Sequence, residues 1–358
     1  MKGWGPAVVA VLLSACGGGT VGALDAEASM DAGVPGPPDA APVRLPDAAH
    51  HLPDAASPPD ASVGHPAPYP IVLVHGFFGF EDFAGVDYVT YFFHVREDLA
   101  ARGETDVFTP ALDPFQDSET RGRELLGHIE GILEETGAAR VNLIGHSQGG
   151  LDARVAASLR PDLVASVTTY ATPNRSGAPV ADVVLGLVDD RRFEALADAL
   201  VRLIAAPLWD AAGNETSVFA SLHQLSTPGI EALNAAHPDA EDVTYFSIAG
   251  RTDRDDGGTV CQAPGAPGFI TRYARSLDPV DPLLDLAEQI TDGGADDLTN
   301  DGLVRVDSAK WGRFLGCVPA DHFDEVGQLL GDGPGFGNDF DHYELFAGLV
   351  AFLRERGF

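Results

Sequence analysis

Short apolar runs alternate with segments of helical periodicity along most of the chain. Runs with the composition of strands lie at residues 71–74, 106–110, 141–144, 164–170 and 245–250. Segments with apolar residues three and four positions apart lie at residues 92–102, 121–135, 151–159 and 346–354. Strands that alternate with helices predict an α/β fold, in which a mostly parallel sheet is covered by helices on both faces.

Residues 189–208 differ from the segments around them. Apolar residues recur there at helical spacing, with acids and arginines between them, after the strand predicted at 164–170. An inserted amphipathic helix of this kind suggests a mobile lid over a binding site. An ordinary surface helix is the alternative.

The first sixteen residues have the pattern of an export signal. A lysine at position 2 precedes an apolar core at residues 7–13, which is too short to cross a bilayer as a helix. Residues 13–16 resemble a bacterial lipobox, in which Cys16 is lipidated and becomes the first mature residue. We therefore expect an outer-membrane or cell-surface lipoprotein, held to the membrane only by its lipid. A secreted protein with an ordinary leader is the alternative.

Residues 17–67 lack hydrophobic periodicity and are rich in proline, alanine and aspartate. The triplet Pro-Asp-Ala recurs at residues 38–40, 46–48, 53–55 and 59–61. Such a segment cannot bury enough apolar surface to offset its conformational entropy, and its prolines favour an extended tether. We place the catalytic domain at residues 68–358.

The chain is strongly acidic, with a formal net charge of −32 among 358 residues and a pI of about 4.4. A negative surface repels phosphate, which argues against nucleic acid and against electrostatic docking on anionic lipid. The length of the remaining chain suits one large α/β domain, which we expect to be a monomer.

Residues 145–149 form a G-x-S-x-G pattern between a predicted strand and a predicted helix. In this setting a serine, here Ser147, becomes a nucleophile because a tight turn presents its hydroxyl above the sheet. A side chain at Gly145 or Gly149 would collide with neighbouring backbone. The alternative is a glycine-rich turn without chemistry.

A serine nucleophile needs a base, and the base needs an acid that orients it. In this architecture the acid and then the histidine follow the serine along the chain. We assign Asp301, at a turn predicted to enter an apolar strand, and His322, in a loop predicted to lead into a helix. The alternatives are His342 as the base and Asp297 or Asp307 as the acid. The glycine-rich loop at residues 75–80 is where one oxyanion donor is expected.

Several separate motifs occur in a recognisable order between about residues 69 and 330. They lie at residues 69–76, 85–88, 121–126, 141–151, 160–169, 277–279, 300–304 and 322–328. Together they resemble the Pseudomonas and Burkholderia type of secreted bacterial triacylglycerol lipases, which are α/β-hydrolases. The resemblance implies Ser147, Asp301 and His322 as the catalytic triad, in preference to His342. It also implies the backbone N–H groups of Phe77 and Gln148 as oxyanion donors.

The same resemblance implies one structural calcium ion beside the loop of the catalytic histidine. Asp278 and Asp324 match its carboxylate ligands, and carbonyl groups near Gln328 and Asp332 would complete the oxygen shell that a hard cation needs. Bridging two loops, the ion would hold His322 near the nucleophile. Members of this family often need a membrane-bound foldase, which is therefore a candidate partner.

Two departures from the family pattern concern cysteine and the lid. Cys261 matches a family cysteine, but the second family cysteine is missing and residues 305–307 stand in its place. In an oxidising compartment we expect Cys261 to pair with Cys317, which joins a different point of the chain. Residues 178–225 match poorly where the family has its lid, and we take them as the lid candidate.

The sequence thus predicts a carboxylester hydrolase acting on lipid or ester substrates through an acyl-enzyme, most simply a triacylglycerol lipase. A short-chain esterase, a phospholipase or a polyester depolymerase would use the same triad. A binding or adhesion lipoprotein on an inactive hydrolase scaffold is the alternative from another class.

Overall fold

The computed structural model describes residues 67–77, 91–189, 215–252, 258–274, 276, 278, 280, 284–293, 298–328 and 338–358. The chain divides into two units, Met1–Ala56 and Ser57–Phe358, and every described residue belongs to the second. The predicted export signal, the tether, residues 190–214 of the lid candidate and Asp332 lie outside the described residues. Among the described residues no helix is long and apolar enough to cross a membrane.

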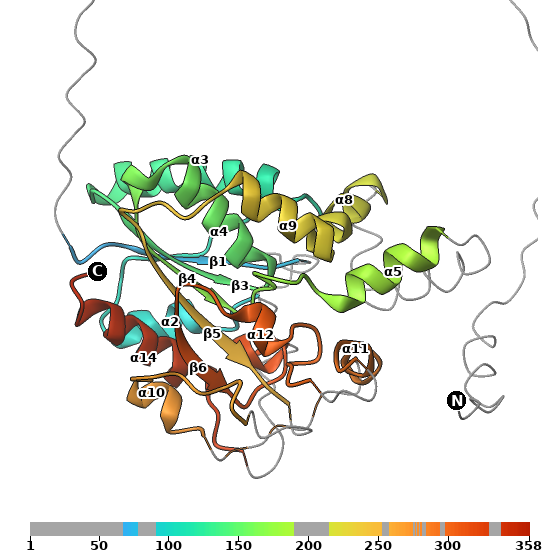
Figure 1. The fold of residues 1–358 in the computed structure, drawn as a ribbon. Coiled ribbons are helices and arrows are strands. Elements are labelled where there is room, and N and C mark those ends of the chain that lie inside the picture. The colour runs from blue at the N-terminus through green and yellow to red at the C-terminus, as the bar shows by residue number, and fades with distance from the viewer. Residues whose placement is uncertain are drawn as a thin grey trace, which may run out of the picture. The chain divides into compact units, whose positions relative to one another are not determined.

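Six strands form one sheet, in the order β2-β1-β3-β4-β5-β6, and every neighbouring pair is parallel. Figure 1 shows this sheet at the centre of the described chain. The strands are β1 (Ile71–Val74), β2 (Val107–Phe108), β3 (Val141–His146), β4 (Val164–Tyr170), β5 (Thr244–Gly250) and β6 (Arg313–Val318). The α/β-hydrolase class expected from the sequence is confirmed.

Helices cover both faces of the sheet, as Figure 1 shows. One face carries α3 (Ser118–Thr136), α4 (Gln148–Leu159), α8 (Glu215–Leu225) and α9 (Thr227–Ala236). The other face carries α2 (Val95–Ala101), α10 (Gly268–Thr271) and α14 (His342–Arg354). Shorter or peripheral elements are η1 (Pro161–Leu163), α5 (Pro179–Asp189), α11 (Asp285–Thr291), α12 (Val306–Ala309) and η2 (Asp324–Val326).

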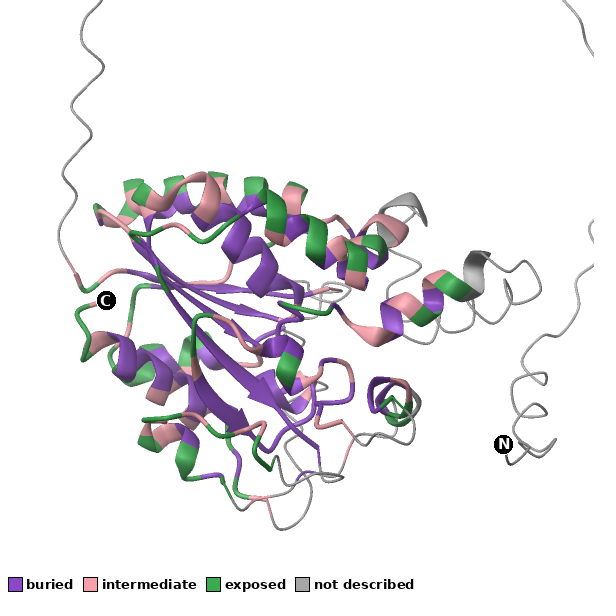
Figure 2. Cartoon of the chain, viewed as in Figure 1, coloured by how far each residue is buried: buried purple, intermediate pink, exposed green. Residues whose placement is uncertain are grey.

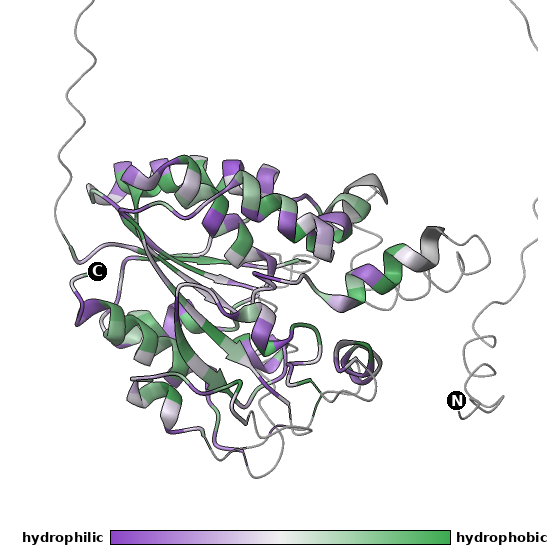
Figure 3. Cartoon of the chain, in the orientation of Figure 1, coloured by the Kyte–Doolittle hydropathy of each residue, from purple (hydrophilic) through white to green (hydrophobic). Residues whose placement is uncertain are grey.

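The alternation of side chains along β1 explains why the sheet needs two helical layers. Ile71 and Leu73 belong to the apolar cluster that contains α2 and α14, whereas Val72 and Val74 belong to the cluster that contains α3 and α4. Strands buried on both faces are apolar at nearly every position. Figure 2 accordingly shows the central strands as buried, and Figure 3 shows mostly hydrophobic positions along the strands and α14.

One local prediction was wrong in part. The predicted turn at residues 300–304 is present, with the Asp301 side chain accepting from the backbone N–H groups of Leu303 and Val304 and with Gly302 at a φ of 97°. It leads into the short helix α12, however, and not into the expected strand. After His322 the chain first makes the 3₁₀ turn η2, and Gln328, the last described residue before 338, is already helical, in agreement with the predicted loop that leads into a helix. Conversely, the edge strand β6 was not predicted from the sequence.

Candidate active site

Ser147 lies at the sharp turn between β3 and α4, with φ 55° and ψ −130°. Few non-glycine residues adopt a positive φ, and such strain is typical of functional sites. The turn can be this tight because glycines, which have no side chain, stand at positions 145 and 149. A Cβ on Gly145 would lie 2.4 Å from the carbonyl oxygen of Gly149, and one on Gly149 would lie 2.1 Å from that of Val74. The predicted strand–turn–helix setting is therefore present.

The loop after β1 lies directly against this turn. A Cβ on Gly76 would come within 2.6 Å of the Cβ of Ser147. The next residue, Phe77, is half-buried, and its ring packs edge-on against Phe115. Gln148 opens α4 and is fully buried, with its side chain donating to the carbonyl oxygen of Gln116 at 2.9 Å. Gln148 thus directly follows the nucleophile, and Gly76, the residue before Phe77, lies against it.

A buried ion pair holds the loop after β1 in place. Arg121 on α3 and Asp152 on α4 are both fully buried and bonded at 2.7 Å, and Arg121 also donates to the carbonyl oxygen of His75 at 2.6 Å. Burial raises the pKa of Asp152 to about 6, although the neighbouring guanidinium opposes this shift. This ion pair could not be predicted, because neither Arg121 nor Asp152 stands in a sequence pattern that indicates its partner.

His322 and Asp301 form a buried pair, with 3.0 Å between Nδ1 and Oδ2. The other carboxylate oxygen of Asp301 accepts from the backbone N–H groups of Leu303 and Val304, and the Asp301 carbonyl accepts from the N–H of His322. Asp301 therefore has a fixed orientation. With Nδ1–H donating to it, Nε2 of His322 is left with the lone pair that a general base needs.

The alternative residues lie elsewhere. His342 begins α14, where Nε2 bonds to the carbonyl oxygen of Phe93 and burial lowers its pKa. Asp307 is exposed on α12, and Asp297 lies outside the described residues. Among the described candidates, the structure pairs His322 with Asp301.

Two buried polar residues that were not predicted as site residues, Glu325 and His146, also lie beside His322. Glu325 is fully buried, and its Oε2 lies 2.7 Å from Nε2 of His146 and 3.8 Å from Nδ1 of His322. Burial, with the nearby Asp301 carboxylate as the next cause, raises the pKa of Glu325 well above its ordinary value. Both His146 and Glu325 lie within the motifs of the nucleophile and the catalytic histidine, which is the one signal that could have found them.

Three buried aspartates gather beside the same loop. One carboxylate oxygen from each of Asp278, Asp321 and Asp324 lies within 4.8 Å of the others. Asp278 and Asp324 were expected to be ligands, whereas Asp321 was not. Gln328 is described, with its backbone N–H bonded to the carbonyl of Phe323. An all-oxygen set of this charge fits a hard cation such as Ca²⁺.

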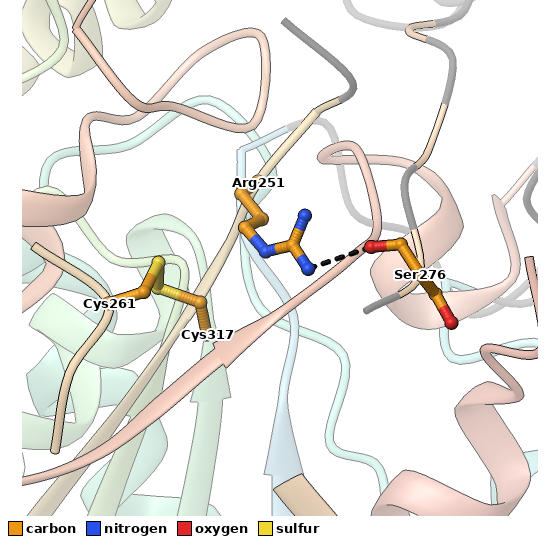
Figure 4. The surroundings of a disulfide bond; sticks show 4 residues. All are labelled: Arg251, Cys261, Ser276 and Cys317. Carbon is orange, nitrogen blue, oxygen red and sulfur yellow. Dashed lines mark hydrogen bonds between the residues drawn. A yellow bond between two sulfur atoms is a disulfide. The ribbon is translucent and has the colours of Figure 1, made fainter. Parts of the chain in front are cut away.

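The expected disulfide is present between Cys261 and Cys317, whose Cα atoms are 5.3 Å apart. It joins the loop after β5 to β6, as Figure 4 shows. Nearby, Arg251 donates to the carbonyl oxygen of Ser276 at 2.7 Å. Both cysteines and Arg251 line a cavity of about 470 Å³.

Comparisons with known proteins agree with this geometry. A family model described as the alpha/beta hydrolase fold matches residues 69–246. The chain is 35% identical to a triacylglycerol lipase of Vibrio cholerae over 269 residues, which cover 74% of this chain and 81% of the relative. It is 34% identical to a triacylglycerol lipase of Pseudomonas fragi over 275 residues, or 73% and 88% of the two chains. One from Burkholderia plantarii is 32% identical over 290 residues, or 74% and 80%.

Among solved structures, EstA from Clostridium botulinum is similar with a TM-score of 0.51 at 19% identity, covering 82% of this chain and 89% of that one. At this identity the likeness concerns the fold alone. The similarity to lipases that the motifs suggested is confirmed by the relatives in sequence.

Proposed function

Since the chain belongs to the triacylglycerol lipase family of α/β-hydrolases, we propose that Ser147, His322 and Asp301 carry out its ester hydrolysis through an acyl-enzyme. The chain is a lipase-type carboxylester hydrolase, and its substrates are lipid or ester molecules. The observation that carries the residue assignment is the buried 3.0 Å pair of His322 and Asp301, combined with the strained backbone of Ser147.

In the first half-reaction, the Ser147 hydroxyl attacks the ester carbonyl while Nε2 of His322 takes its proton. Asp301 stabilises the resulting imidazolium through Nδ1–H. The backbone N–H groups of Phe77 and Gln148 stabilise the negative oxygen of the tetrahedral intermediate, and one such donor typically lowers the barrier by roughly 3–4 kcal/mol. His322 then returns its proton to the departing alcohol.

In the second half-reaction, water attacks the acyl-enzyme, again with His322 as the base. The acid is released and Ser147 is regenerated. Both halves use the same donors, because both pass through a tetrahedral intermediate of the same charge.

Replacing Ser147 with alanine tests the assignment. The variant should fold, with the same melting temperature and circular dichroism as the wild type, but should lose hydrolysis of p-nitrophenyl esters. A fluorophosphonate probe should label the wild type and not the variant. Retained hydrolysis by folded Ser147→Ala would remove the nucleophile assignment. An unlabelled, inactive wild type would favour a binding protein instead.

The preferred substrate follows from a second experiment. We propose long-chain triacylglycerols, on the support of the relatives named triacylglycerol lipase. Rates should be compared on emulsified and dissolved esters of increasing chain length. A preference for dissolved short-chain esters would instead indicate an esterase.

We further propose that Asp278 and Asp324 hold a calcium ion, together with carbonyl groups near Gln328 and Asp332. A carboxylate oxygen of Asp321 lies within 4.8 Å of theirs, which supports Asp321 as a third ligand. Bound there, the ion would neutralise the buried carboxylates and fix the loop, since Asp321 directly precedes His322. The chemistry of ester cleavage needs no step through the ion.

Export with a lipid on Cys16 is also a proposal, supported by the lipobox pattern. Incorporation of labelled palmitate in an expressing bacterium, and its loss in Cys16→Ser, would test it. Co-expression with and without a lipase foldase would show whether folding depends on that partner.

A further inference from the structure

A continuous chain of polar side chains runs through the protein interior behind the triad. At its centre lies His146, the residue before the nucleophile, with a fully buried side chain. Nδ1 of its ring lies 2.7 Å from the hydroxyl of Tyr91, and Nε2 lies 2.7 Å from Oε2 of Glu325. Both nitrogens of the ring are therefore hydrogen-bonded without water.

At one end, this row of polar side chains reaches the loop after β1, which supplies the first oxyanion donor. The backbone of Gly76 hydrogen-bonds to the hydroxyl oxygen of Tyr91. The fit is close, because a Cβ on Gly76 would lie 2.6 Å from that oxygen. Gly76 directly precedes Phe77, so the position of Tyr91 affects where the N–H of Phe77 points.

The other end reaches the loop of the catalytic histidine. Oε2 of Glu325 lies 3.8 Å from Nδ1 of His322, and the rings of His146 and His322 lie 4.6 Å apart between centroids at an angle of 38°. The ring of His146 thus packs against the ring of His322, and the carboxylate of Glu325, which is bonded to His146, approaches Nδ1 of His322.

We propose that His146 is a positioning residue that links the oxyanion loop to the loop of His322 through Tyr91 and Glu325. The inference rests on the proposed function, because it assumes that His322 and the N–H of Phe77 act on one substrate. Acyl transfer requires both groups to be aligned to within a fraction of an ångström, and misplacement by about 1 Å can cost roughly 100-fold in rate. An imidazole can join a hydroxyl and a carboxyl on opposite sides, whereas an apolar side chain of the same volume joins neither.

The opposing interpretation is that His146 is a core histidine whose bonds stabilise the fold and nothing more. In that case breaking the chain of hydrogen bonds would lower the melting temperature and leave turnover unchanged. The two interpretations therefore differ in kcat, measured well below the melting temperature.

Tyr91→Phe provides the test, because it removes one hydroxyl from the chain and keeps the ring. Tyr170→Phe is the matched control. The Tyr170 ring also packs against His146, at 5.5 Å between centroids, and it is also buried. Its hydroxyl, however, has no hydrogen-bond partner among the described residues.

On a soluble p-nitrophenyl ester, Tyr91→Phe should lower kcat about 10-fold or more with KM within two-fold of the wild type, the pattern of a lost transition-state interaction. The rate of fluorophosphonate labelling should fall in parallel, and Tyr170→Phe should keep the wild-type kcat. His146→Gln, which retains an amide for one of the two partners, should lie between wild type and His146→Leu in kcat.

Equal kcat values for Tyr91→Phe and Tyr170→Phe would overturn the proposal. Ser147→Ala is run in the same assay to separate this failure from failure of the proposed function. If Ser147→Ala is inactive while Tyr91→Phe turns over normally, only the positioning role is lost. If Ser147→Ala remains active, the function and the positioning role fall together.

Discussion

The carboxylate of Asp301 is held from two sides. One oxygen accepts two backbone N–H groups of its own turn, and the other faces Nδ1 of His322. The turn thus orients the acid, and the acid orients the base. A general base requires such an acid, since the imidazole alone could rotate or adopt the wrong tautomer.

Asp301→Asn should therefore lower kcat by about 100-fold or more while the protein stays folded, because an amide that donates to Nδ1 favours the wrong tautomer of His322. Steady-state kinetics on a soluble ester measure the effect. Asp307→Asn, an exposed acid on the neighbouring α12, is the control and should behave as wild type. A loss below five-fold in Asp301→Asn would contradict the assignment.

His75 gives a prediction about stability. Burial, with Arg121 as the next cause, lowers the pKa of His75 from 6.5 to about 3. Between these values the unfolded chain binds a proton that the folded protein does not. The contribution of His75 to stability is therefore complete above pH 6.5 and is lost as pH falls toward 3, by up to about 1.4 kcal/mol per pH unit.

Urea unfolding at pH 7, 6, 5 and 4 measures this slope. His75→Asn should reduce the loss of stability between pH 6.5 and 4, whereas substitution of the exposed His128 on α3 should not. If the slope is the same in wild type and His75→Asn, the buried neutral state of His75 is wrong.

The residues that sequence could identify are those whose signal is local. The glycines on either side of Ser147 indicate the nucleophile, and the motifs around Asp301 and His322 indicate the acid and the base. Tyr91 lies outside those motifs, and Glu325 lies inside one that does not indicate its partner, because the importance of both arises from contacts with His146 across 55 and 179 residues of chain. Such contacts depend on the assembled sheet.

Among the elements, β6 shows most clearly what periodicity misses. It begins with an exposed arginine and contains Gly316 at a φ of 129°, so its apolar pattern is interrupted. As the edge strand of the sheet it also needs less apolar surface than β3 or β4. Its position nevertheless matters for function, since β6 leads directly into the loop of His322.

The disulfide ties this edge strand to the loop after β5. In the loop-entropy description, a bridge over 56 residues stabilises the protein by about 4 kcal/mol, chiefly by restricting the unfolded chain. Cys261→Ala, Cys317→Ala and the double variant should each lose this amount, without additivity, in urea unfolding. A reductant should destabilise the wild type but not the double variant. Additive losses would mean that packing, not the bridge, supplies the stability.

The acidic loop next to β6 gives a prediction for metal removal. EDTA should lower both the melting temperature and the activity, because three buried carboxylates repel one another without a cation. A ligand at 100 times its Kd contributes about 2.7 kcal/mol. Calcium should restore both properties and magnesium should not, since Mg²⁺ demands a tighter octahedron.

Asp324→Asn is the companion variant and should respond less to EDTA than the wild type does. An unchanged melting temperature of the wild type in EDTA would count against the site.

At the scale of the whole molecule, the parallel sheet explains how residues distant in sequence come together. The chain leaves β1, β3 and β6 at the same edge, because parallel strands end on one side. Gly76 follows β1, Ser147 follows β3, and His322 follows β6 after a few residues. Strand order was needed to place these ends side by side, and the sequence pattern predicts strands without their order.

The net charge of −32 also acts on the whole molecule. Self-repulsion destabilises a folded state that is far from electrical neutrality, and salt screens it. At pH 7 and constant calcium, raising NaCl from 20 to 500 mM should raise the melting temperature by about 3 °C, or roughly 1 kcal/mol. At pH 5, nearer the pI of about 4.4, the same salt step should have a smaller effect. Equal shifts at both pH values would mean that salt acts through burial of apolar surface instead, because that effect does not depend on net charge.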